Sequence, residues 1–246
     1  MKSSKSLLTF TVLAVALVAS GIALMEGRAV SDDLMLDLEL SKNDFLLGEP
    51  IEFRVALRNM TTKDIVIANT IDPVYGSLKI WSRSEKQSKF DQYVNPKWGI
   101  LEPNGSVRIK PGESTSNNFR LIARLDAENL PRFYFAHPGI YELKVSYEIH
   151  VQHEERTRSV ESRAVIIRIN EPVGEDLVVW NRIKEMGELA YFLQNADFHM
   201  PIYRKEERDA LRVRIEEILD QYPSSALSEA FRRSLVIFRK SAKGRN

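Results

Sequence analysis

The sequence contains no cysteine among its 246 residues. Disulfide bonds, thiol nucleophiles, zinc–thiolate sites and iron–sulfur clusters are therefore excluded. The fold must depend on buried apolar side chains, and a hydrophobic content of 43% is enough for a sizeable core. The chain also lacks an excess of charge of either sign, because 35 basic residues face 34 acidic ones. This balance gives no general field that would attract nucleic acid, so we expect no nucleic-acid partner.

The motifs of common enzyme and cofactor classes are missing as well. The chain has no Gly-x-Ser-x-Gly elbow, His-Glu-x-x-His helix, phosphate-binding loop or Gly-x-Gly-x-x-Gly dinucleotide motif. His150 and His153 lie at the end of a predicted strand, where residues three apart point to opposite faces and do not converge on a metal. We therefore predict no catalytic residue, no metal and no cofactor, and we expect a protein that is not an enzyme.

The N-terminal segment is informative. Lys2 and Lys5 precede an uncharged, mostly apolar run at residues 7–24, a pattern typical of an export signal. Small residues before Val30 allow cleavage there, so residues 1–29 can be a signal peptide. The run is also long enough to stay as a membrane anchor, which needs roughly 18 residues, or to form a buried helix. With export, the remainder is periplasmic, secreted or held at the outer face of the cytoplasmic membrane.

Residues 30–171 show the period of β-strands. The longest such stretch places Tyr141, Leu143, Val145, Tyr147 and Ile149 at alternate positions, with polar residues between them. Alternation of this kind indicates a strand with one face in a core and the other in water. Further short alternating segments are separated by turn signals, with no helical pattern between them. The region therefore predicts an antiparallel β-sandwich.

Residues 172–246 have a different pattern. After Pro172, apolar residues recur at helical spacing, and we predict three amphipathic helices. Asp176 is placed to cap the first helix, and Pro223-Ser224-Ser225 opens the third. Helices of this length are marginal alone, so we expect them to pack on one another and on the sandwich.

Turn motifs give the sandwich a recognisable character. Pro138-Gly139-Ile140-Tyr141-Glu142-Leu143 is similar to the Gly-x-Tyr-x-Cys motif of immunoglobulin strand F, with Leu143 in place of the cysteine. Together with Gly48-Glu49-Pro50 and Pro111-Gly112-Glu113, it resembles the immunoglobulin-like domains of bacterial envelope proteins over about residues 33–170. The intracellular proteinase-inhibitor family shows a similar order of motifs, although no inhibitory loop can be matched. The resemblance implies an immunoglobulin-like fold and a hydrogen bond from the Tyr141 hydroxyl back to the chain.

One segment is a candidate for ligand binding. Residues 71–98 contain five aromatic side chains among lysines and acids: Tyr75, Trp81, Phe90, Tyr93 and Trp98. Exposed rings at the end of a sandwich can stack on sugar or peptide, whereas buried rings would only cover the core. We expect a non-enzymatic binding or interaction module of the bacterial cell envelope, with an envelope protein or a glycan as partner. The alternative is a secreted hydrolase or a protease-inhibitor-like protein.

The end of the chain is basic. No acid follows Glu229, whereas six cationic residues do: Arg232, Arg233, Arg239, Lys240, Lys243 and Arg245. Cations there complement the negative end of a helix dipole, and they also suit a membrane surface or another anionic partner. The sequence favours the first interpretation, and it predicts membrane contact only through residues 7–24, if these are not cleaved.

Overall fold

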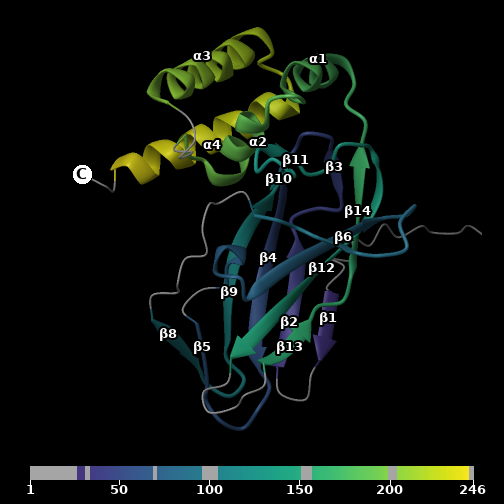
Figure 1. The fold of residues 1–246 in the computed structure, drawn as a ribbon, viewed down its shortest axis with the longest axis vertical. Helices are drawn as coiled ribbons and strands as arrows, with labels where there is room; N and C mark the ends of the chain where they lie inside the picture. Colours follow the sequence, from purple (N-terminus) through teal and green to yellow (C-terminus); the bar gives the residue numbers. More distant parts are fainter. Residues whose placement is uncertain are drawn as a thin grey trace, which may run out of the picture.

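The computed structural model describes residues 27–30, 34–68, 71–95, 105–150, 157–198 and 204–243. These residues are mainly β structure, and four helices gather at one end of the molecule (Figure 1). The strands are β1 (Gly27–Val30), β2 (Leu34–Leu40), β3 (Asp44–Leu46), β4 (Ile51–Asn59), β5 (Ile65–Ala68), β6 (Leu78–Ser84), β7 (Asp91–Gln92), β8 (Ser106–Ile109), β9 (Ser114–Leu121), β10 (Ala123–Leu125), β11 (Pro131–Phe133), β12 (Gly139–His150), β13 (Thr157–Glu161) and β14 (Val165–Asn170). A single 3-10 turn, η1 (Pro73–Tyr75), precedes β6, and the helices are α1 (Gly174–Ile183), α2 (Gly187–Asn195), α3 (Lys205–Gln221) and α4 (Ala226–Lys243).

Two larger sheets make up most of the β structure. One has the strand order β1-β2-β4-β9, and the other has the order β3-β14-β12-β6-β7, with β13 also paired to β12. The strands pair antiparallel except for β3 and β14, whose parallel pairing departs from the all-antiparallel prediction. Strand β2 contacts both β12 and β13, so the two sheets face each other. Two small pairs, β5–β8 and β10–β11, complete the β region.

The core between the two sheets follows from the period of the strands. On β12, Leu143 and Val145 are 0% exposed and Tyr147 is 1% exposed, as the alternation predicted. Leu36 and Leu38 of β2 are fully buried in the same apolar cluster. Where β12 begins, the Tyr141 hydroxyl donates a hydrogen bond of 2.9 Å to the His137 carbonyl, the link that the tyrosine motif implied.

The C-terminal region has four helices, whereas the sequence predicted three. The first predicted helix is divided at Met186 into α1 and α2. The reason is visible at Gly187, where α2 meets β11: a Cβ atom there would lie 1.5 Å from the Pro131 carbonyl oxygen. Only glycine permits this approach, so α2 starts in a new direction and lies against the sheet rather than continuing α1.

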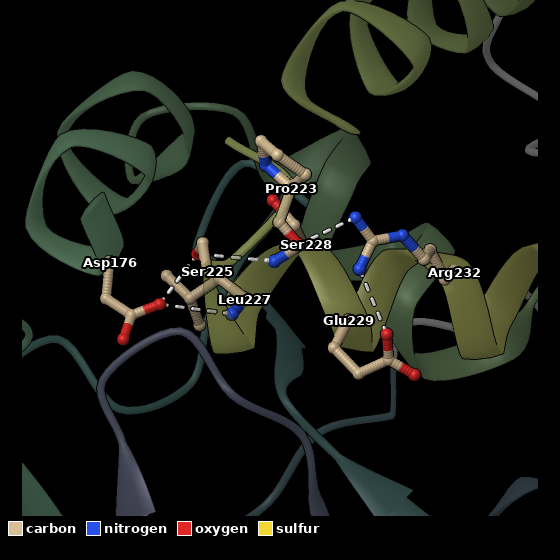
Figure 2. A network of polar contacts seen from close by, with 7 residues as sticks. All are labelled: Asp176, Pro223, Ser225, Leu227, Ser228, Glu229 and Arg232. Carbon is tan, nitrogen blue, oxygen red and sulfur yellow. Dashed lines mark hydrogen bonds and ion pairs between the residues drawn. The ribbon is translucent and has the colours of Figure 1, made fainter. Parts of the chain in front are cut away.

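Asp176 also differs from its predicted role. It lies inside the first turn of α1, and its carboxylate reaches across to the start of α4 (Figure 2). Asp176 Oδ1 accepts hydrogen bonds from the Ser225 hydroxyl at 2.6 Å and from the Leu227 N–H at 3.4 Å. Ser225, just before α4, accepts from the Ser228 N–H at 3.4 Å in the manner of an N-cap. Asp176 and Ser225 therefore both cap the start of α4, and this contact joins α1 to α4.

The helices and the sheets share one apolar core. The Trp180 indole of α1 meets the Phe133 ring of β11 edge to face, with 4.9 Å between ring centroids. It also covers Gly48, where a Cβ would come within 2.7 Å of the indole. The buried cluster runs without interruption from Leu36 to Phe231 of α4. This packing holds α2 and α4 firmly at the end of the four-stranded sheet.

Candidate functional site

Two of the predicted aromatic residues lie together on the outer face of the β6–β12 sheet. Trp81 is half-buried on β6, and its indole N–H donates to the Ser146 hydroxyl at 3.0 Å. Phe90 is also half-buried, between the Arg83 guanidinium at 4.7 Å and the Lys144 ammonium at 4.9 Å from its ring centroid.

The charges on this face are paired. Arg83 bonds Glu142 at 2.8 Å, Lys144 bonds Glu161 at 2.8 Å, and Lys79 pairs with Glu148. On this face, the charged side chains around Trp81 and Phe90 form ion pairs with one another. Each cation has a carboxylate partner, so the face has no surplus charge to offer a ligand.

The other predicted rings are separated from this pair. Tyr93 is 6% exposed and points into the core, where its ring meets Tyr134 edge to face at 5.3 Å. Burial raises the pKa of its phenol well above the usual value, and only the hydrogen bond from Gln194 opposes the increase. Tyr75 ends η1, and Trp98 lies outside the described residues. The five residues therefore remain a predicted binding set, of which the structure brings Trp81 and Phe90 to one face.

A groove of about 630 Å³ lies at the junction of the four-stranded sheet with the helices. Its charged and polar side chains come from outward positions of three neighbouring strands, which the register brings side by side: Glu39 of β2, Glu52 and Arg54 of β4, and Asn118 and Arg120 of β9. The remaining lining residues are Leu40, Ser41, Phe53, Phe119 and Gln194. The volume is that of a small-ligand site.

Gln194 of α2 fixes the helix-side end of the groove. Between β9 and β10 the chain turns, and the N–H groups of Ile122 and Ala123 both donate to Gln194 Oε1, at 3.1 and 2.8 Å. The Gln194 amide N–H donates in turn to the Tyr93 hydroxyl. One side chain thus satisfies two buried backbone donors and joins α2 to both sheets.

Arg120 stands out among the charges of the groove. It is half-buried beneath α4, and one guanidinium nitrogen donates to the Ser234 hydroxyl at 2.9 Å. Burial lowers the pKa of this guanidinium; Glu52 opposes the decrease and Arg233 adds to it. Within the described parts of the chain Arg120 forms no ion pair, although Glu52 faces it across the β4–β9 register.

The two carboxylates of the groove already have other partners. Glu52 pairs with Arg233 of α4 at 3.7 Å, and Glu39 pairs with Arg54 at 3.2 Å. The groove and its helix wall thus contain three guanidinium groups and two carboxylates. Arg120 is the cation left over. An incoming anion at this point would gain a charge-assisted hydrogen bond without having to displace an existing ion pair.

The sequence carried little sign of this groove. Its charged residues occupy outward strand positions, which is the pattern of an ordinary solvated face. Their convergence depends on the β2-β4-β9 order and on α4 crossing above Arg120, and neither is a local property.

Other chemistry is limited in the described residues. No cluster of three or more His, Asp or Glu side chains there could hold a metal ion. The pKa of Asp126 is lowered first by the Leu130 N–H, against some desolvation, and further by Arg132; this carboxylate organises a turn. No helix in the described ranges has the length and apolar character needed to cross a bilayer.

Comparisons with known proteins give no family and only weak structural similarities. No protein-family model matches this chain, and no curated protein matches it. Among solved structures it is similar to a β-glucosidase from Erythrobacter marinus, at 14% identity and a TM-score of 0.31, over 56% of this chain and 15% of that one. A β-glucosidase from Listeria innocua is similar at 12% identity and a TM-score of 0.30, over 56% of this chain and 16% of that one. The C-terminal domain of wzt is similar at 8% identity and a TM-score of 0.35, over 61% of this chain and 80% of that one. These likenesses are too weak to support a fold or an activity.

Proposed function

We propose that this protein is an exported, non-enzymatic binding module of the bacterial cell envelope that holds a carboxylate-bearing ligand in the groove beside Arg120. In this proposal the two facing sheets form an immunoglobulin-like sandwich, and the helices form one wall of its binding site. The basic start of the chain and the apolar run at 7–24 support export, and the absence of cysteine suits a bacterial envelope better than a eukaryotic secretory route.

The observation that carries the proposal is that Arg120 is half-buried and forms no ion pair with any of the residues that the structure describes. Burial has removed part of the hydration of this guanidinium, and the charge of Glu52, which is already paired with Arg233, compensates that loss only in part. A ligand carboxylate supplies a further counter-charge, and Arg233, whose charge also acts on Arg120, can share in the contact. Guanidinium groups suit this role because their planar donors match a carboxylate.

The ion pairs of the two groove carboxylates favour a binding function over a hydrolytic one. A hydrolase of the two-carboxylate kind needs one acid held neutral as a proton donor in an apolar setting. Glu39 and Glu52 each lie beside an arginine instead. The aromatic face around Trp81 is a second binding surface in principle, but its cations are already paired, so we place the ligand in the groove.

Isothermal titration tests the proposal, with a hyaluronan disaccharide as a single-carboxylate probe and neutral N,N′-diacetylchitobiose as its control. Arg120→Gln should weaken binding of the charged probe roughly 10- to 100-fold, the value of one charged hydrogen bond of about 1.5–3 kcal/mol. Arg233→Gln should weaken binding of the charged probe less than Arg120→Gln does. Because Arg233 is on an exposed helix position, this variant tests the groove even if Arg120→Gln fails to fold.

The matched control is Arg108→Gln, because Arg108 is highly exposed on β8 and does not line the groove. Equal binding of the neutral probe, or no effect of either groove arginine, would overturn the proposal. Loss of binding in Trp81→Ala alone would move the site to the aromatic face. Release of free sugars from the probe would identify a hydrolase.

A further inference from the structure

The exposed side of α4 meets the groove where Arg233 pairs with Glu52. Arg233, Ile237 and Lys240 lie at i, i+4 and i+7, so they occupy one face of the helix. Arg233 points down to Glu52 at one end of the groove, which fixes the direction of this face. Ile237 is 43% exposed and Lys240 is exposed, so the face beyond Arg233 presents an apolar contact followed by a second cation.

The two cations are separated by a defined length. Seven residues of α-helix at a rise of 1.5 Å place Arg233 and Lys240 about 10 Å apart along the axis. Cations in the last turn of a helix stabilise it by compensating the helix dipole. Arg233 lies in the middle of α4 (Ala226–Lys243), so this effect does not explain its position. The row therefore suits a ligand that carries anionic groups at intervals comparable with a disaccharide unit.

The floor of the groove limits the kind of polyanion. Glu39 and Glu52 line the groove together with the cations, and their oxygens repel a ligand with closely spaced negative charges, such as a nucleic acid. The same oxygens, with Asn118 and Ser41, accept hydrogen bonds from hydroxyl groups. A ligand rich in hydroxyls and sparse in negative charge satisfies both conditions.

Resting on the proposed function, we propose that the ligand is a linear acidic polysaccharide in which carboxylated and neutral sugars alternate. One carboxylate lies against Arg120 and Arg233, the neighbouring sugar packs on Ile237, and the next carboxylate reaches Lys240. The hydroxyls of the first sugars donate to Glu39 and Asn118. The spacing of the cations on α4 thus selects polymers whose carboxylates repeat at that interval.

Hyaluronan oligosaccharides test this arrangement, because a glucuronate alternates with a neutral N-acetylglucosamine along them. The tetrasaccharide, with two carboxylates, should bind the full chain at least 10-fold more tightly than the disaccharide. Lys240→Gln should remove most of that gain while leaving disaccharide binding unchanged. Ile237→Ala should weaken binding of both oligosaccharides, because the neutral sugar that packs on Ile237 is already present in the disaccharide. Arg239→Gln is the matched control, since Arg239 is exposed on a different face of α4 and should retain the gain.

The outcomes separate this inference from the proposed function. If the disaccharide binds and depends on Arg120 but the tetrasaccharide gains nothing, only the polymer along α4 is wrong. If neither the disaccharide nor the tetrasaccharide binds, the groove is not the binding site, and both the proposed function and this inference are wrong. Equal affinity for polyglutamate of the same charge would show that sugars are not selected. Binding to vesicles containing anionic phosphatidylglycerol that is lost in Lys240→Gln would assign this face to a lipid surface instead.

Discussion

The amide of Gln194 offers the sharpest test of how the helices are held. Gln194→Leu keeps the size of the side chain but removes the acceptor of two backbone N–H groups, those of Ile122 and Ala123. Both residues are buried, at 3% and 0% exposure, so water cannot replace the lost oxygen. A buried donor without a partner costs about 1–3 kcal/mol, and two of them predict a loss of about 3 kcal/mol in the free energy of unfolding.

Urea unfolding followed by far-UV circular dichroism measures this loss, and hydrogen exchange locates it. The amides of Ile122 and Ala123 should exchange faster in Gln194→Leu. Gln194→Glu keeps an acceptor oxygen and should lose much less stability. Gln87→Leu is the matched control, because the Gln87 oxygen accepts an exposed turn N–H; its cost should stay within about 0.5 kcal/mol. A Gln194→Leu protein as stable as the parent, with unchanged exchange, would refute the reasoning.

Two further predictions concern the junction and the core. Gly187→Ala should lower the free energy of unfolding, measured with urea, by more than about 3 kcal/mol, because its Cβ meets the Pro131 backbone. Gly76→Ala is the control: Gly76 has open space around it, so this variant should lose only about 1 kcal/mol. Equal losses in the two variants would contradict the close contact at Gly187. Burial raises the pKa of Tyr93 and Tyr134 above the usual 10.0, so the unfolded chain loses these protons at a lower pH than the folded chain does. The free energy of unfolding should therefore be constant below about pH 10 with respect to these groups. Above about pH 10 it should fall by up to about 1.4 kcal/mol per pH unit for each tyrosine. Phenolate absorbance should therefore rise together with loss of circular dichroism, and ordinary titration of all tyrosines in a folded protein would contradict this.

Strand patterns were predictable because they depend on neighbours in the sequence. The alternation around Leu143 and Tyr147 is enough to predict which side chains are buried, because a pleated strand has only two faces. The division between α1 and α2 was not predictable in the same way. Helical periodicity continues through Gly187, and the contact that interrupts the helix comes from Pro131, more than fifty positions earlier.

The candidate site was the least predictable part. Trp81 and Tyr93 belong to the same aromatic segment, yet one lies on an outer face and the other in the core. The hydrogen-bond partner of the Tyr93 hydroxyl is Gln194, 101 positions away in the chain. The groove depends on the same kind of distant pairing, since Arg120 meets Ser234 of α4. Composition and spacing cannot anticipate such contacts, because they arise from the order of strands and the path of the helices.

The shared core has a consequence for the order in which the molecule can mature. Trp180 and Phe231 enter the chain late, yet they pack into the same interior as Leu36, near its start. A chain that emerges N-terminus first therefore keeps part of its interior uncovered until its final quarter has arrived. During that interval the uncovered apolar surface favours aggregation, and a fragment that ends near Pro172 would keep that surface exposed.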